Sequence, residues 1–170
     1  LSQPEQQMIS DIAQCGYYYR LLNGFVAQEL TEISFADPRK NPSIYRKAIA
    51  QGLKGSLKEY EDLVLGIERD FLLNQHFTFG NIKAEIGNYG LAMQELSMLV
   101  QKIVQEKYRG AVIIDIWWES YQKGALWLRK WVEGVLRECQ RVFVNQVVAW
   151  IAHGQLADVE GEFFIHKVIH

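Results

Sequence analysis

The sequence has few cysteines and few prolines, two and three respectively among its 170 residues. The cysteines, Cys15 and Cys139, are isolated and occupy core-like positions inside helical patterns. We expect both to be reduced and buried as small apolar side chains. Of the prolines, Pro4 and Pro42 fall at two predicted helix starts, and Pro38 falls in the predicted loop between those helices.

The sequence also lacks an excess of charge. It carries 18 basic and 20 acidic residues, a formal charge of −2, which gives no reason to expect a nucleic-acid partner. No block of like charge suggests a polybasic membrane arm. No apolar run approaches the roughly 20 residues that span a bilayer, and the start has no signal-peptide pattern.

What is present is the composition of an ordinary soluble globular protein, with 49% apolar and 22% charged residues. A chain of this size buries about 70% of its unfolded surface and could form one domain. It begins at Leu1 without a methionine and stops at His170 just after an apolar segment. From these ends we expect a fragment of a longer protein.

Apolar residues recur in alternating steps of three and four, which is the pattern of helices with a buried seam. In the first half it predicts two helices joined by the loop FADPRKNPS, residues 35–43. The second helix is expected to start with Asn41 as N-cap and Pro42 at the first helical position. The seam residues are Ile9, Ile12, Gly16, Tyr19, Asn23, Val26, Leu30 and Ile33, then Leu53, Leu57, Tyr60, Val64, Ile67 and Phe71.

Three glycines in this half indicate close contacts between helices. Gly16 lies on the first seam and is expected to let a neighbouring helix approach. Gly52 and Gly55 lie inside a helical pattern and lack an aromatic platform nearby. We therefore interpret them as helix–helix contacts rather than as a GxxG nucleic-acid loop.

A second connector, 74–80, is the only place where the sequence could be divided. We predict a first helical hairpin over residues 1–73 and a second helical sub-bundle over residues 78–170. Thr78 or Asn81 is expected to cap the third helix.

The segment AVIIDIWW, residues 111–118, could be a buried strand, because it is β-branched and aromatic. The chain offers no strand partner, so we predict a short buried helix. A final long helix has a broad apolar face, which implies more than one neighbour, and Gly154 ends it. The predicted fold is all-α: an elongated bundle of about four long helices and one short helix, ending in a short apolar segment.

Two pairs of residues could carry chemistry. His166 and His170 have the spacing of metal ligands on a helix, but no third ligand lies near them. Asp115 and Glu119 share a helix face, where paired carboxylates could do acid–base work. The motifs GxSxG, GxGxxG and CxxC and the P-loop are absent. We expect no cofactor and no metal, and an interaction module rather than an enzyme.

The most informative stretch is WIAHGQLADVEGEFFI, residues 150–165. A helix runs into Gly154, a short acidic turn follows, and three large apolar residues stand behind the carboxylate of Glu162. An apolar run of this kind is expected to be covered, because an exposed one would favour association.

This stretch resembles the gamma-tubulin complex component family, in which W-[IV]-x-x-G-x-L leads through an Asp-containing turn to E-F-F-[IV]. The family usually has proline where this chain has Val159. Residues 45–72, YRKAIAQGLKGSLKEYEDLVLGIERDFL, resemble the family helix Y-x-x-A-[IF]-x-x-G-L-x-x-x-L-x-x-Y-x-x-x-[VL]-L-x-[IL]-E. The matching residues of the first motif are Trp150, Ile151, Gly154, Leu156, Asp158, Glu162, Phe163, Phe164 and Ile165.

The resemblance covers nearly the whole chain, as the amino-terminal part of the family's first GRIP region, and is greatest to the smallest, component-four type. It implies a non-catalytic scaffold subunit that contacts sibling components laterally, so that gamma-tubulins are arrayed for microtubule nucleation. Gamma-tubulin would bind only through a carboxy-terminal region absent from this sequence. The implied location is the cytoplasm and cytoskeleton, at a microtubule-organising centre such as a centrosome or spindle pole. A small helical regulator is a further partner that the resemblance allows.

For the partner interface we predict the first two helices and the intervening loop, through Asp37, Arg39, Lys40 and Asn41. Trp150, Gly154, Phe163 and Phe164 are expected to serve the fold. Two alternatives stay open. One is a helical adaptor or tethering-complex subunit unrelated to microtubules, and the other is an all-α enzyme that uses Asp115 and Glu119.

Overall fold

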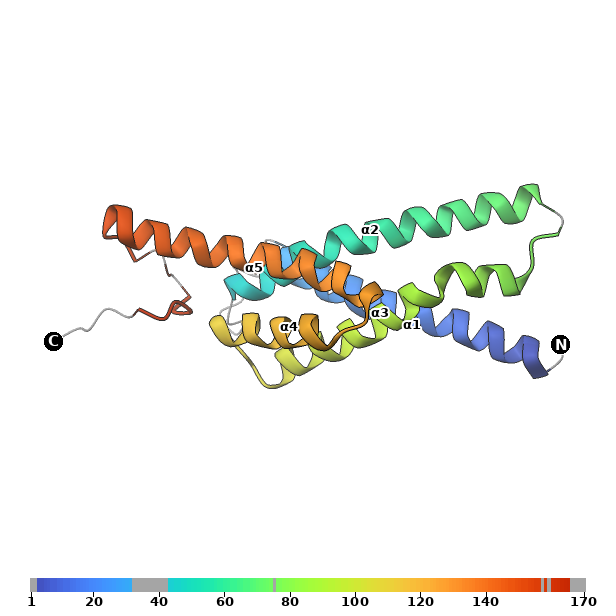
Figure 1. Cartoon of the computed structure of the whole chain (residues 1–170), viewed down its shortest axis with the longest axis horizontal. Helices are drawn as coiled ribbons and strands as arrows, with labels where there is room; N and C mark the ends of the chain where they lie inside the picture. Colours follow the sequence, from blue (N-terminus) through green and yellow to red (C-terminus); the bar gives the residue numbers. More distant parts are fainter. Residues whose placement is uncertain (1–2, 32–42, 75, 157, 159, 166–170) are drawn as a thin grey trace.

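The computed structural model describes residues 3–31, 43–74, 76–156, 158 and 160–165, and these form five α-helices and no strand (Figure 1). The all-α prediction is confirmed, with four long helices and one short one. The segment 111–118 is helical, as predicted, but it is only partly buried: Ile113 and Trp117 are buried, whereas Val112 and Trp118 are exposed. The helices are α1 (Gln3–Leu30), α2 (Ile44–Leu73), α3 (Phe79–Gln105), α4 (Ala111–Lys123) and α5 (Leu126–His153).

The helices form an elongated bundle in which the start of α1 and the end of α5 lie at opposite ends (Figure 1). α1 packs mainly along α3 and also contacts α2, while α2 packs along α5. α4 lies against α5 and touches α3. α5 also contacts α3, so it has three neighbours, in agreement with the more than one neighbour predicted from its broad apolar face. The division between residues 1–73 and 78–170 stays a prediction.

One apolar core runs through all five helices. Both cysteines lie in it and are free thiols, and burial raises the pKa of Cys139 to about 12. The largest fully buried side chains are Trp117, Tyr45, Leu22, Ile49, Leu53, Met93, Leu96, Ile103, Ile113, Val132, Val135 and Cys139.

Only one of the three predicted glycine contacts is formed. A Cβ at Gly52 would lie 2.5 Å from the Cα of Val135, so α2 and α5 touch there through their backbones. The predictions for Gly16 and Gly55 are wrong, because a Cβ at either would meet no atom within 4 Å. The close approach of α1 to α3 occurs instead at Gly90, where a Cβ would collide with the sulfur of Cys15.

Two seam predictions were also partly wrong. In α1 the buried side chains include Leu22 and Phe25, whereas the predicted seam residue Asn23 is exposed. α1 contacts both α2 and α3, so its buried face is set by two neighbours rather than by one seam. In α2, Val64 and Phe71 are 39% and 51% exposed, because no described helix covers them.

Helix ends follow ordinary capping chemistry. Ser43, rather than Asn41, is the N-cap of α2, and its hydroxyl accepts the Arg46 N–H at 3.1 Å. Thr78 caps α3, as predicted, and its backbone N–H donates to the side-chain oxygen of Asn81 at 3.0 Å. Gly154 ends α5 with φ of +63°, also as predicted. None of these helices is long and apolar enough to cross a membrane.

Candidate functional site

The segment after α5 folds back on itself around one aspartate. The carboxylate of Asp158 accepts the backbone N–H groups of Glu162 and Phe163, at 2.8 and 2.9 Å. Gly161 has φ of +67°, the left-handed conformation that a tight return of the chain requires. Asp158 therefore shapes the turn that presents Glu162 to the bundle.

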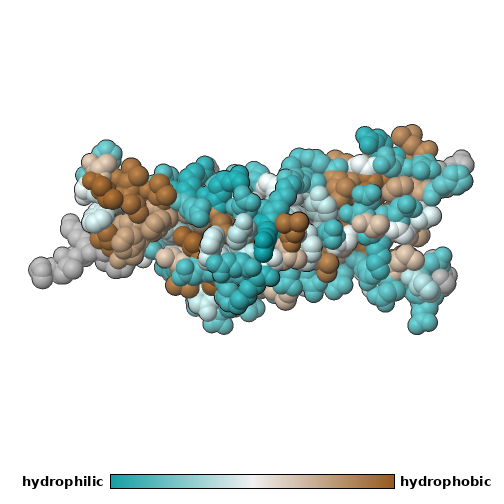
Figure 2. Space-filling model, in the orientation of Figure 1, coloured by the Kyte–Doolittle hydropathy of each residue, from teal (hydrophilic) through white to brown (hydrophobic). Residues whose placement is uncertain are grey.

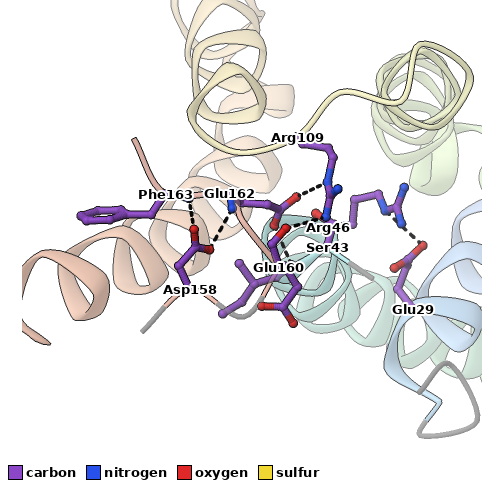
Figure 3. Close-up of polar contacts among 9 residues, drawn as sticks. Glu29, Ser43, Arg46, Arg109, Asp158, Glu160, Glu162 and Phe163 are labelled. Carbon is purple, nitrogen blue, oxygen red and sulfur yellow. Dashed lines mark hydrogen bonds and ion pairs between the residues drawn. The ribbon is translucent and has the colours of Figure 1, made fainter. Parts of the chain in front are cut away.

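Glu162 joins three parts of the fold (Figure 3). Its carboxylate is fully buried and accepts the Ile44 N–H at the start of α2, at 2.9 Å. The other carboxylate oxygen accepts the Arg109 Nε–H at 3.1 Å, from the turn between α3 and α4. Arg109 also donates to the backbone oxygen of Glu160 at 3.1 Å. We call Asp158, Glu162, Arg109 and the Ile44 N–H the C-terminal latch.

The position of the Glu162 carboxylate suits its charge. The first N–H groups of a helix have no partner within the helix, and the helix dipole favours an anion beside them. Glu162 supplies that anion from 118 residues away. Its burial is offset by the guanidinium of Arg109, because a buried charge needs both a partner and hydrogen bonds.

Gly110 makes room for the latch. Its φ of +62° is left-handed, and a Cβ there would lie 2.6 Å from the backbone oxygen of Glu162. A side chain would therefore both strain the turn and push the C-terminal segment away.

Further polar contacts tie the start of α2 to its neighbours. Arg46 forms an ion pair with Glu29 of α1 at 3.5 Å. The hydroxyl of Tyr45 donates to the side-chain oxygen of Gln146 on α5 at 3.1 Å, in the core. Burial, together with the nearby Cys139 and Glu162, raises the pKa of Tyr45 to about 12. α2 is thus held on three sides at its first turns.

The structure separates the motif residues of the C-terminal stretch into two groups. Phe163 is buried at 2% exposure, with its ring 6.4 Å from that of Phe143. Phe164 lies against the same ring but is 60% exposed. The exposed members are Trp150, Ile151, Leu156 and Phe164, and Ile165 is intermediate.

The expected cover over the apolar run is therefore complete for Phe163, partial for Ile165 and lacking for Phe164. Trp150 and Phe164 were also expected to serve the fold, yet no described helix passes over them. Apolar side chains gather at this end of the bundle and again at the opposite end (Figure 2). At the opposite end, the exposed large apolar residues are Val64, Leu65, Phe71, Leu72, Leu73 and Phe79.

The predicted catalytic carboxylates do not form a site. Asp115 and Glu119 are both exposed on α4. Glu119 pairs with Lys123, and this hydrogen bond lowers the pKa of its carboxyl group. Two solvated carboxylates, one of them neutralised, cannot act as a buried acid–base pair. The enzyme alternative therefore loses the residues it was based on.

Two other predicted groups lie outside the described residues. They are the loop residues Asp37, Arg39, Lys40 and Asn41, and the histidine pair at positions 166 and 170. Within the part of the chain that the structure does describe, no group of three histidine, cysteine or carboxylate side chains could hold a metal ion.

Sequence reasoning missed Arg109, Gly110 and the Ile44 N–H. Their partner Glu162 lies 53 residues beyond Arg109, and no local pattern connects the two. The one available signal was a carboxylate placed directly before an apolar run.

The chain was compared with known proteins. The family model described as gamma tubulin complex component N-terminal matches residues 1–169. A gamma-tubulin complex component 4 from Arabidopsis thaliana is 26% identical over 180 residues, covering 96% of this chain and 24% of the relative. The component 4 proteins of Mus musculus and Homo sapiens are 25% and 24% identical over 170 residues, covering 96% of this chain and 26% of each relative. The chain thus spans about a quarter of the length of these relatives.

Proposed function

Because the chain belongs to the gamma-tubulin complex component family through that N-terminal domain, we propose that it is a non-catalytic scaffold subunit of the gamma-tubulin complex. The observation that carries this proposal is the match to the family's N-terminal domain over residues 1–169. The role we propose is lateral contact with the corresponding domains of sibling components. The proposed location is the cytoplasm and cytoskeleton, at a microtubule-organising centre.

The proposed mechanism is geometric. Bundles lined up side by side hold gamma-tubulins at a fixed spacing, so that a new microtubule does not have to assemble its first ring from free subunits. Such a scaffold must be stiff. The backbone contact at Gly52, the C-terminal latch and the core shared by five helices favour stiffness.

Gamma-tubulin itself is proposed to bind elsewhere in the full-length protein. The relatives are about four times as long as this chain, which leaves most of their length for that contact. The chain alone is then expected to bind siblings without binding gamma-tubulin.

For the lateral surface we propose the solvent face of α1. It presents the ring of Tyr17, which is 58% exposed and lies edge-on to Tyr18 at 5.5 Å. Exposed aromatic rings are frequent anchors of protein interfaces because they bury much area at low entropic cost.

Sedimentation velocity tests the proposal. The chain is run alone and mixed with the N-terminal domains of candidate sibling components. We expect a monomer that forms a defined heteromer with at least one sibling, and loss of that heteromer in Tyr17→Glu. Trp118→Glu, at a 46% exposed tryptophan on α4, is the matched control and should leave the heteromer intact.

Two results would count against the scaffold role. One is the absence of any sibling complex at high micromolar concentration. The other is stoichiometric capture of gamma-tubulin by this chain alone.

A further inference from the structure

The bundle opens at the end opposite the latch. There α2 and α3 diverge as they approach their connector (Figure 1). A groove of about 260 Å³ lies between them. Its floor is formed by Leu63, Ile67 and Phe77, and its sides by Asp62, Asp70 and Glu85. We call these six residues the distal groove.

α2 leaves its own apolar side chains uncovered around this groove. All of its buried residues lie between Tyr45 and Tyr60. Beyond Tyr60, Leu65, Leu72 and Leu73 are 59%, 75% and 78% exposed. Large apolar side chains gathered at one place on a soluble protein mark an interaction site.

The polar lining of the groove has one sign of charge. Three carboxylates line it and no basic side chain does. Asp62 and Asp70 have exposed ion pairs with Lys58 and Arg69, at 2.9 and 3.5 Å. Exposed pairs of this kind contribute little free energy, so a partner's cation can replace them.

This combination specifies the chemistry of the occupant. The apolar floor requires an apolar stripe, and the length of exposed α2 suits another helix lying along it. The carboxylates on both sides require positive charge beside the stripe. We propose that the distal groove docks an amphipathic helix of a partner protein, with an apolar stripe flanked by lysine or arginine.

The same charges disfavour two other occupants. A second copy of this chain would bring its own Asp62, Asp70 and Glu85 against the same carboxylates. An anionic membrane surface would be repelled by them as well. The proposal is independent of the lateral contact proposed for α1, because the groove lies on different helices.

Two model peptides test the proposal. Both are helical with the same leucine stripe, and one carries flanking lysines where the other carries flanking glutamates. Binding to the full 170-residue chain is followed by fluorescence anisotropy. We expect the lysine peptide to bind at least about tenfold more tightly at low salt, with the difference shrinking as salt screens the charges.

Variants locate the binding. The double substitution Asp70→Lys with Glu85→Lys should weaken the lysine peptide about tenfold and strengthen the glutamate peptide. Glu106→Lys, at the exposed C-cap of the same α3, is the matched control and should change neither. Leu72→Asn should weaken both peptides. All four sites are exposed, so thermal unfolding should confirm that every variant folds.

Three results would overturn the proposal. The first is equal affinity for the two peptides, and the second is no binding of the lysine peptide. The third is binding that Asp70→Lys with Glu85→Lys leaves unchanged. Dimerisation of the chain alone that Leu72→Asn abolishes would instead make a second copy the occupant.

Discussion

At one end of the bundle, the segment after α5 is held in place by the carboxylate of Glu162. This carboxylate accepts hydrogen bonds from the start of α2 and from the α3–α4 turn. At the other end α2 and α3 diverge and leave large apolar side chains in solvent. Both ends carry exposed apolar residues. At the first, the fully buried carboxylate of Glu162 is bonded to two distant segments, whereas near the second a part-buried hydrogen bond from Tyr19 of α1 reaches Glu61 of α2. As far as the structure describes the chain, α2 beyond Tyr60 forms no hydrogen bond or ion pair with α3.

Exposure alone does not distinguish a structural end of the bundle from a binding end. At the latched end, buried Glu162 and Phe163 fix the backbone, and exposed Phe164 lies on top of a fixed segment. At the distal end the distinguishing feature is the groove, because in the described residues no hydrogen bond or ion pair joins α2 beyond Tyr60 to α3. Substitutions should therefore have large effects on stability at the first end and small ones at the second.

The largest effect on stability is expected from a substitution at Phe163. Phe163→Ala should lower the free energy of unfolding by about 3–5 kcal/mol, because it leaves a cavity beside Phe143. Phe164→Ala is the matched control and should cost less than about 1 kcal/mol, since that ring is largely in solvent. Urea unfolding measures both. Equal losses in the two variants would contradict the separation of the motif into buried and exposed groups.

The next effect is expected in the latch. Glu162→Ala leaves the Ile44 N–H without its acceptor and removes the carboxylate partner of Arg109, which should lower the free energy of unfolding by about 2–3 kcal/mol. Glu133→Ala, which breaks an exposed pair with Arg137, should stay within about 0.5 kcal/mol of the parent. Urea unfolding measures both variants. If the latch added no stability, the two variants would have the same free energy of unfolding.

A substitution at Tyr45 should have a smaller effect on the free energy of unfolding, and this effect should depend on pH. Tyr45→Phe removes the hydrogen bond to Gln146, which should cost about 1–2 kcal/mol near neutral pH. The pKa of Tyr45 is raised from 10.0 to about 12 in the folded chain, so its contribution is complete below pH 10.0 and is lost as pH rises towards 12.

The test is chemical unfolding at a series of pH values. The parent should lose stability through this alkaline window, and Tyr45→Phe should lose it less steeply. If the free energy of unfolding fell equally with pH in the two proteins, the ionisation of Tyr45 would not be linked to unfolding.

The smallest effect is expected at the distal end. Leu72→Asn changes a side chain that is 75% exposed, so the free energy of unfolding should stay within about 0.5 kcal/mol of the parent. Circular dichroism melting is sufficient to check this. A larger loss would mean that the tip of α2 is packed in solution, which would remove the groove as an open surface.

The features predicted correctly from the sequence are those set by local chemistry. Helix existence follows from apolar periodicity, and the ends at Thr78 and Gly154 follow from capping preferences within a few residues. The helical state of 111–118 followed from the absence of a strand partner. The first two inferences need only neighbours in the sequence, whereas the third needs a survey of the whole sequence for a strand partner.

The features that were missed depend on tertiary contacts. Glu162 bonds to residues 53 and 118 positions away, so its role cannot be read from the C-terminal stretch itself. The seam of α2 continues regularly past Tyr60, but whether Val64 and Phe71 are buried depends on where α3 lies. Gly16 and Gly90 both lie inside helices, and only the packing of α1 on α3 shows which of them makes the close contact.

Hydrogen exchange of the 170-residue chain, followed amide by amide, tests the contrast between the two ends most directly. We expect slow exchange for the amides of Ile44, Glu162 and Phe163, which donate to the latch carboxylates. We expect faster exchange in the last two turns of α2 and the first turns of α3. Rapid exchange at Glu162 and Phe163, with strong protection around Phe71 to Leu73, would show that the contrast between the two ends is wrong.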